Sequence, residues 1–488
     1  MNSNLRPENM KILYNILNAL IDGPMQVFEF KNFSNLMNHL STIFQYELSI
    51  SILDNLVNKF NLGTVNNKTK LKTLLEFIEP MIKMDQPDLS EFLLNKSIYK
   101  ISKLVYVPAS KDPYEQLEMF QNVKKALINS TKNNNEYLSE KKLIIYLTNY
   151  INCLCLFGLN ISETYDNLVN DDKDEENEKD EKDEEKKSQL QLDFCNNYNF
   201  NNKKFDVDKD ETFLAFYKLL FKEINSVFDI IKPLSLERAL KLYIQCGQMV
   251  NGLKFDEIEQ FETFAYEYIN NALLILKKEN KKEDNNNKNT DNKNNKNSDN
   301  TNTNTNATEE DEIIEENQKF NYLTNIIGAV STMDIFTEKH LNDICSNIEK
   351  MIEGLVKRRE QCLLMLKCIN LYCNEVEEDT NKIVALFSKA KKYAVYSMTN
   401  PENTILFVYI LNEYIRLDGV IKDFDKTVKV NDVEEIIETI NNYLISMKNE
   451  NKDSEMIKRI EDYYKNTIDC IKQKKGDKKY KLMSTLKI

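Results

Sequence analysis

The sequence predicts an all-α protein built from a linear array of helical hairpins. Glycine and proline are scarce, with 9 and 8 residues among 488, and tryptophan is absent. Long stretches repeat their apolar residues at steps of three and four, which is the period of a helix and not of a strand. A chain of this length has room for two or three ordinary domains or for one array, and the composition favours the array.

The stretch from Leu236 to Leu276 is the clearest example of one hairpin. The apolar stripe of its first helix consists of Leu236, Ala239, Leu240, Tyr243, Ile244, Gly247 and Val250. The stripe of its second helix consists of Ile258, Phe261, Ala265, Tyr268, Ile269, Ala272, Ile275 and Leu276. Between the stripes, we expect Gly252 to end the first helix in a left-handed conformation and Asp256 to cap the second.

One hairpin of this kind cannot bury enough apolar surface to offset the entropy lost when it is ordered. Neighbouring hairpins that stack on both flanks bury the remaining apolar faces. The sequence therefore predicts repeats that share a structural period, although their residues differ, as in arrays of the HEAT type.

Helix signals recur in order along the rest of the chain, giving about eighteen expected helices. Pro7 suits the first turn of a helix that Asp22, Gly23 and Pro24 end. Pro401 after Asn400 marks a later start, and Asn431 is an expected cap. Further helices are expected at 25–42, 45–60, 68–84, 114–128, 139–157, 211–231, 234–250, 314–332, 337–355, 357–374, 381–398, 401–416, 432–447 and 454–473.

Two low-complexity inserts interrupt this pattern and are expected to be disordered, because they lack core-forming residues. The first is acidic and Asn-rich, and the second is rich in Asn and Lys. For the second insert, an Asn-rich low-complexity expansion is favoured over a dedicated binding arm. The resulting divisions are 1–168, 169–209 (first insert), 210–276, 277–312 (second insert), 313–474 and a basic tail at 475–488.

The formal net charge of -13 arises mainly in these inserts. Residues 170–188 hold 11 acidic and 5 basic groups, and residues 277–317 hold 11 acidic and 7 basic groups. The remainder is nearly balanced, so charge says little about the partner of the folded part. Nucleic acid is not an expected partner.

The sequence gives no sign of an enzyme, a cofactor or a metal site. Only two histidines occur, His39 and His340, and each is interpreted as a packed or surface residue. The phosphate-binding, dinucleotide-binding, serine-hydrolase and zinc-protease motifs are absent. Cys362, Cys368 and Cys373 are spaced too widely for a zinc pair and are expected to be apolar core residues.

The expected location is the cytosol, where the nine cysteines would be reduced. No apolar run is expected to reach the length needed to cross a bilayer, and the N-terminus lacks the apolar core of a signal peptide. Two basic segments leave alternatives open. Lys357, Arg358 and Arg359 form a solvated helix start or a partner contact, and the six lysines of 472–481 belong to a frayed end or touch an anionic membrane.

Several motifs resemble the C-terminal half of the vacuolar protein sorting-associated protein 35 family, the large scaffold subunit of retromer. The opening hairpin supplies 240–245 (Leu-Lys-Leu-Tyr-Ile-Gln) and 263–268 (Thr-Phe-Ala-Tyr-Glu-Tyr). The other matching segments follow the family's order along the chain. They are 84–88, 112–113 with 116–117, 326–328, Leu355 with Lys357 and Gln361, Cys368 with 371–372, and Phe407 with 410–412 and 414–415.

The resemblance implies a curved, right-handed α-solenoid without activity of its own. Its concave side would hold the small retromer subunit, which has a metallophosphoesterase fold, and would cover that partner's pseudo-catalytic pocket. The complex would support endosome-to-Golgi transport and recycling of membrane cargo, with the chain peripherally associated with endosomal membranes. The expected partner-binding residues are Lys357, Arg358, Gln361, Asn370, Tyr372, Asn412 and Tyr414.

Three departures from the family pattern qualify the resemblance. The Pro-Arg-Leu-Tyr-Leu motif, which serves the arrestin-fold subunit, is missing, so that partner is expected only through an N-terminal half absent here. The second insert follows Leu276, close to where the family's legs are thought to pair, which leaves self-association open. Asn370 and Cys373 replace an expected His and Trp. The alternative function is a generic HEAT-type scaffold or transport adaptor.

Overall fold

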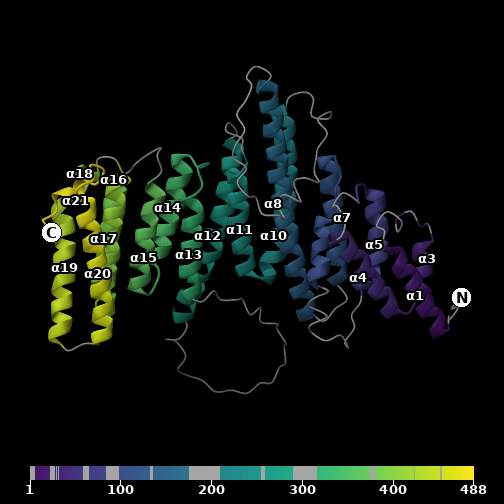
Figure 1. The fold of residues 1–488 in the computed structure, drawn as a ribbon, viewed down its shortest axis with the longest axis horizontal. Helices are drawn as coiled ribbons and strands as arrows, with labels where there is room; N and C mark the ends of the chain where they lie inside the picture. The colour runs from purple at the N-terminus through teal and green to yellow at the C-terminus, as the bar shows by residue number, and fades with distance from the viewer. Residues whose placement is uncertain are drawn as a thin grey trace. The chain divides into compact units, whose positions relative to one another are not determined.

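The computed structural model describes most of the chain, and its elements are labelled in Figure 1. The described residues are 6–21, 28, 30, 32–58, 65–83, 98–131, 136–174, 209–253, 259–288, 316–373, 380–421, 424–450 and 453–487. Within them the structure is helical, and the β-structure is limited to one isolated parallel bridge between Val65 and Pro108. The prediction of an all-α protein is confirmed.

The chain divides into two compact units, Met1–Ile258 and Glu259–Ile488. The boundary falls inside the hairpin predicted for 236–276. Both of its helices form, as α11 (Leu236–Asn251) and α12 (Glu259–Lys288), and the expected cap Asp256 lies outside the described residues.

The first unit is an array in which each helix packs mainly on its neighbours in the sequence. Helix α1 packs on α4, α4 on α5, α5 on α7 and α7 on α8. Helix α8 also packs on both α10 and α11. Successive pairs bury each other's apolar stripes, as predicted for stacked hairpins. The elements are α1 (Pro7–Ile21), α3 (Phe33–Met37), α4 (Thr42–Asn58), α5 (Lys68–Lys83), η1 (Lys103–Tyr106), α7 (Pro113–Thr131), α8 (Glu136–Asp174), α10 (Lys209–Leu234) and α11.

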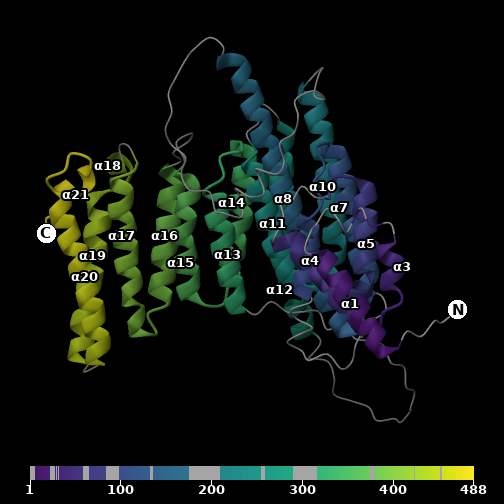
Figure 2. The ribbon, with the colours of Figure 1, turned by 45° about the vertical axis from the view of Figure 1, so that its right-hand side comes forward.

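The helices of the second unit, drawn from teal to yellow in Figure 2, pack in two layers. One layer contains α13, α15, α17 and α20, and the other contains α12, α14, α16 and α19. The elements are α12, α13 (Glu316–Val330), α14 (Glu338–Glu353), α15 (Arg358–Cys368), η3 (Ile369–Tyr372), α16 (Thr380–Tyr396), η4 (Pro401–Thr404), α17 (Ile405–Asp418), α18 (Phe424–Thr427), α19 (Val430–Asn449), α20 (Ser454–Lys474) and α21 (Lys481–Thr485).

Helix α8 corrects the statement that no apolar run is long enough for a bilayer. Residues 139–163 meet that length and hydropathy, and 56% of the apolar window is buried inside the protein. The helix packs on α7, α10 and α11, with Tyr150 and Phe157 fully buried. Its apolar character is that of a core helix that touches several neighbours.

A buried carboxylate ties three helices of the first unit together. Glu223 of α10 accepts hydrogen bonds from the Tyr150 hydroxyl of α8 (2.9 Å) and the Gln121 amide of α7 (3.1 Å). Lys124 of α7 forms an ion pair with it at 2.5 Å. Because Glu223 belongs to α10 and its partners belong to α7 and α8, this cluster fixes the register of the three helices.

Two predicted helix ends differ from the structure. Gly252 has φ -78° and is right-handed, and a Cβ there would lie 3.1 Å from Leu159. The close approach of α8, and not a left-handed turn, therefore explains why glycine occupies position 252. Asn431 is not a cap, because α19 begins at Val430 and the Asp432 carboxylate accepts from the Lys429 N–H (3.2 Å).

Other predicted boundaries also shift. The helix expected at 25–42 is represented by the short α3, which ends at Met37. Helices α8 and α12 extend to Asp174 and Lys288 and therefore run into the first residues of the two predicted inserts. The rest of the two predicted inserts, 175–208 and 289–312, lies outside the described residues.

The C-terminal segment is not a frayed end. Leu482 and Met483 of α21 are fully buried, and Leu486 is nearly so. The Asp418 carboxylate at the end of α17 accepts the backbone N–H groups of Leu482 (3.0 Å) and Met483 (2.8 Å). This carboxylate therefore holds α21 against the second unit.

Glycine at position 419 makes that docking sterically feasible. A Cβ on Gly419 would lie 2.6 Å from the Tyr480 ring, a distance that side chains do not tolerate. Lys475 also donates to the carbonyl of Leu486 (2.5 Å). The segment that follows α20 is thus part of the folded unit.

Candidate partner-binding surface

Gln361, one of the expected partner-binding residues, is fully buried. Its amide donates to the carbonyls of Glu353 (2.8 Å) and Leu355 (2.9 Å), and its oxygen accepts from Arg358 (2.8 Å). These bonds hold the turn between α14 and α15. Gln361 is therefore a positioning residue and offers no surface to a partner.

Tyr372 and Tyr414 are also interior residues, each 7% exposed. The Tyr372 hydroxyl of η3 donates to Glu349 of α14 (3.0 Å). The Tyr414 ring of α17 stacks on Phe387 of α16 with centroids 3.9 Å apart and an interplanar angle of 8°. Burial raises the pKa of both hydroxyls. The expectation that these rings face a partner is wrong, because they join neighbouring helices.

Asn370 and Asn412 are half-buried at joints of the layer that contains α17 and α20. Asn370 accepts from Arg416 of α17 (2.7 Å). Asn412 donates to the Tyr463 hydroxyl of α20 (3.2 Å) and accepts from Thr467 (2.9 Å). Both amides keep some surface exposed, while their polar atoms are engaged in links between helices.

Lys357 and Arg358 are exposed at the start of α15. Lys357 pairs with Glu360 (3.2 Å), and the Arg358 guanidinium lies 5.9 Å from the centre of the Tyr393 ring. A helical rise of about 1.5 Å per residue puts Arg358 roughly 18 Å from Asn370 along the axis of α15 and η3. The structure therefore leaves these expected residues at two separate places.

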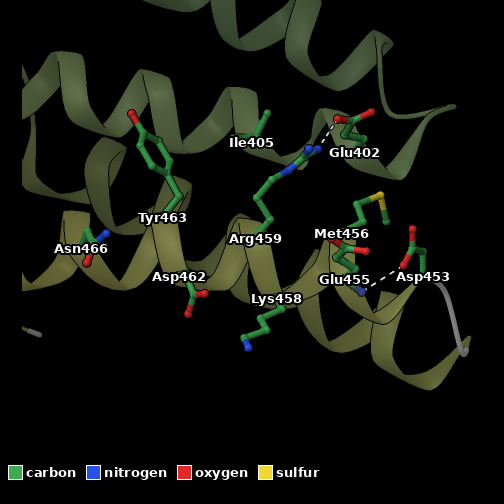
Figure 3. A pocket seen from close by; sticks show the side chains of 10 residues that line it. All are labelled: Glu402, Ile405, Asp453, Glu455, Met456, Lys458, Arg459, Asp462, Tyr463 and Asn466. Atoms are coloured by element: carbon green, nitrogen blue, oxygen red, sulfur yellow. Dashed lines mark hydrogen bonds and ion pairs between the residues drawn. The ribbon is translucent and has the colours of Figure 1, made fainter.

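An open groove of about 930 Å³ lies between η4, the start of α17 and the first half of α20. Figure 3 shows its ten lining side chains, with Arg459 reaching across to Glu402 as an ion pair. Asp453 accepts the Glu455 N–H (2.9 Å) and so caps α20. The sequence does not predict this groove, because its two walls come from distant parts of the chain. Arg459 and Glu402, which meet across it, are 57 residues apart in the sequence.

The opposite layer of the second unit carries charges that are paired between helices. Lys389 of α16 contacts Glu349 and Glu353 of α14 at 2.8 Å each. Lys391 of α16 contacts Glu435 of α19 at 2.6 Å. Burial opposes the charged form of Lys389, but its two carboxylate partners prevail and raise its pKa. These pairs link α14, α16 and α19.

Glu262 forms a second buried carboxylate cluster, in the layer that contains α12 and α14. Its Oε1 accepts from the N–H and hydroxyl of Thr337 (2.7 and 2.6 Å) and lies 2.6 Å from His340 Nδ1. Burial acts to raise the pKa of Glu262, but hydrogen bonds from Thr337 and His340 outweigh it and lower the pKa. His340 thus orders the start of α14.

The cysteines of the described residues are free thiols, and most are buried. Burial raises the pKa of Cys362 to about 12 and that of Cys368 well above its usual value. Such thiols are poor nucleophiles and metal ligands. No group of three or more His, Cys, Asp or Glu residues that could hold a metal ion occurs in the part of the chain that the structure describes.

Stacked helices, polar joints between them and an open groove define a helical-repeat scaffold. Residues 2–443 match the family described as vacuolar protein sorting-associated protein 35. The match covers most of the 488 residues, so the chain belongs to this family, whose members are trafficking scaffolds and not enzymes.

The other comparisons add little. No curated protein matches the chain. Among solved structures, a chain described as "Circular tandem repeat protein with novel repeat topology and enhanced subunit contact surfaces" is similar at 10% identity. The similarity covers 97% of this chain and 94% of that one, with a TM-score of 0.47. A TM-score this low supports no structural or functional inference.

Proposed function

We propose that this chain is the non-enzymatic scaffold subunit of a retromer-like endosomal coat. It binds the small metallophosphoesterase-fold subunit and supports endosome-to-Golgi transport and recycling of membrane cargo. The observation that carries the proposal is the family match over residues 2–443. The stacked helices of both units supply the extended surface that a scaffold needs.

The exposed cations at the start of α15 are the best candidates for direct contact with this partner. Lys357 and Arg358 project from the surface, whereas Gln361 beneath them is fully buried and bonded to the preceding turn. Long cationic side chains on a fixed turn suit an acidic patch on a partner. Asn370 and Asn412 are a second, half-buried contact region in this proposal.

Co-elution of the full chain with the purified small subunit tests this surface. The double substitution Lys357→Ala and Arg358→Ala is expected to weaken the complex by about tenfold, as for two lost charge contacts at an interface. The matched control is Lys465→Ala with Lys478→Ala, which removes two exposed cations elsewhere in the second unit. If the two double substitutions weakened the complex equally, the α15 surface would not be the contact site.

The chain would act in the cytoplasm, peripherally associated with endosomal membranes through its partners. Contact with the arrestin-fold subunit would require an N-terminal half of the family that is not among these residues. Self-association remains part of the proposal and is tested by light scattering of the chain alone. A chain that binds no retromer subunit would be assigned instead to the generic class of HEAT-type scaffolds or transport adaptors.

A further inference from the structure

The groove between η4 and α20 lies largely outside the family match, which ends at residue 443. One wall is formed by Glu402 and Ile405, and the other by α20 and its cap Asp453. The family assignment therefore says nothing about most of its lining. Its function has to be argued from the side chains themselves.

Negative charge is in excess along the groove. Arg459 is neutralised by Glu402, with which it forms an ion pair. Glu455 and Asp462 are exposed on α20 and have no ion-pair partner among the described residues. Lys458 is the other cation in the lining, and it likewise forms no ion pair within the described part of the chain. In the α14–α16 layer, in contrast, the exposed Glu353 and Glu435 form ion pairs with lysines of a neighbouring helix.

An aromatic ring lies among these carboxylates in a fixed orientation. Tyr463 is 38% exposed, and its hydroxyl accepts a hydrogen bond from Asn412 (3.2 Å). Tyr409 makes a T-shaped contact with this ring, with centroids 5.6 Å apart and an interplanar angle of 76°. Ile405 and Met456 add partly exposed apolar surface beside it. A partly exposed tyrosine ring beside unpaired carboxylates favours a guanidinium or ammonium group.

We infer that this groove binds a basic segment of a partner protein. An arginine of that segment would stack on Tyr463 and pair with Asp462 or Glu455, while neighbouring apolar side chains would contact Ile405 and Met456. The occupant is identified by charge complementarity, because the unpaired acids outnumber the one unpaired cation. This site goes beyond the proposed coat function, and neither depends on the other.

Fluorescence anisotropy with a labelled hexa-arginine peptide and the full chain tests the inference. The isosteric pair Glu455→Gln and Asp462→Asn is expected to weaken binding by about tenfold, in line with two partly exposed charge contacts. The matched control is Asp425→Asn with Glu438→Gln, two exposed acids on α18 and α19. It should change binding by less than about twofold. Any binding of the peptide to the acidic residues 170–188 is common to both variants and cancels.

Tyrosine substitutions separate stacking from charge. Tyr463→Ala should weaken binding by about fivefold, whereas Tyr463→Phe, which keeps the ring, should retain most of it. Equal losses in the groove and control variants would overturn the inference, and so would equal binding of a hexa-glutamate peptide. A chain that dimerises without peptide, and whose dimer is lost with Glu455→Gln and Asp462→Asn, would overturn it in favour of a second copy as occupant.

Discussion

Tyr414 and Tyr463 lie on the adjacent helices α17 and α20, yet their surroundings differ. Tyr414 is 7% exposed and stacks on Phe387, so it fastens α17 to α16. Tyr463 is 38% exposed and lies in the groove, where its ring makes a T-shaped contact with Tyr409 and its hydroxyl accepts a hydrogen bond from Asn412. One ring is a joint between helices, and the other is part of a surface.

The same distinction holds for the charged residues of the second unit. Glu262 and Asp418 are buried, and each accepts backbone N–H groups at the start of another helix. Glu455 and Asp462 are exposed and have no ion-pair partner among the described residues. The comparison indicates that buried side chains bonded to a neighbouring helix stabilise the fold. Exposed side chains without such a partner are the ones available for binding.

The largest effect is expected from Tyr414→Ala, compared with Tyr463→Ala. Loss of the buried ring leaves a cavity against Phe387 and should cost about 3–5 kcal/mol, whereas the exposed ring should cost less than about 1 kcal/mol. Hydrogen exchange of the α16 and α17 amides measures this difference. Similar hydrogen-exchange protection of these amides in both variants would contradict the distinction between a buried Tyr414 that joins helices and a surface Tyr463.

Asp418→Ala is expected to have the next largest effect, because it removes the acceptor of the buried N–H groups of Leu482 and Met483. Two orphaned donors should cost about 2–3 kcal/mol and release α21. Limited trypsin digestion would then cut faster at Lys479 and Lys481. The control is Asp425→Ala, an exposed aspartate near the same segment. Unchanged digestion of the Asp418 variant would mean that apolar burial alone holds α21.

Glu262→Gln should have a smaller effect of about 1–2 kcal/mol at neutral pH, since glutamine retains one acceptor oxygen but loses the charge. The folded-state pKa of Glu262 lies below its ordinary value of 4.5. The stability it contributes is therefore complete above that value and lost as the pH falls through the lower folded-state pKa.

Hydrogen exchange of the α12 and α14 amides at about pH 6.5 and about pH 4 checks this pH dependence, after correction for intrinsic rates. The difference between the native chain and Glu262→Gln should shrink at the lower pH. Glu338→Gln, an exposed acid in the first turn of α14, is the control. A difference that stays constant or grows on acidification would contradict the assigned role of Glu262.

Helical periodicity in the sequence was enough to predict most of the fold. The stripes of α11 and α12, and the start at Pro401, depend on local spacing and capping, which are visible in one segment. The docking of α21 was missed, although Leu482, Met483 and Leu486 have helical spacing. Its anchor, Asp418, is 64 residues away from Leu482, and nothing local reveals that pairing.

The candidate surface is harder to predict because it, too, depends on contacts between residues that are far apart in the sequence. A tyrosine on a helix can lie in a joint or on the surface, and only the neighbouring helix decides which. The sequence therefore predicts a partner contact for Tyr372 and Tyr414, whereas the structure bonds Tyr372 to Glu349 and stacks Tyr414 on Phe387. The groove at Tyr463 requires η4 and α20 to meet, which spacing along the chain does not show.

The most direct test of the proposed coat function is a calorimetric titration of the full chain with the purified small metallophosphoesterase-fold subunit of the same organism. The account predicts binding at or below about micromolar, as for a specific complex. It also predicts that the exposed Lys357 and Arg358, and not the groove residues of α20, control the affinity. No heat and no co-elution, from a chain shown to be helical and monodisperse, would contradict the proposal.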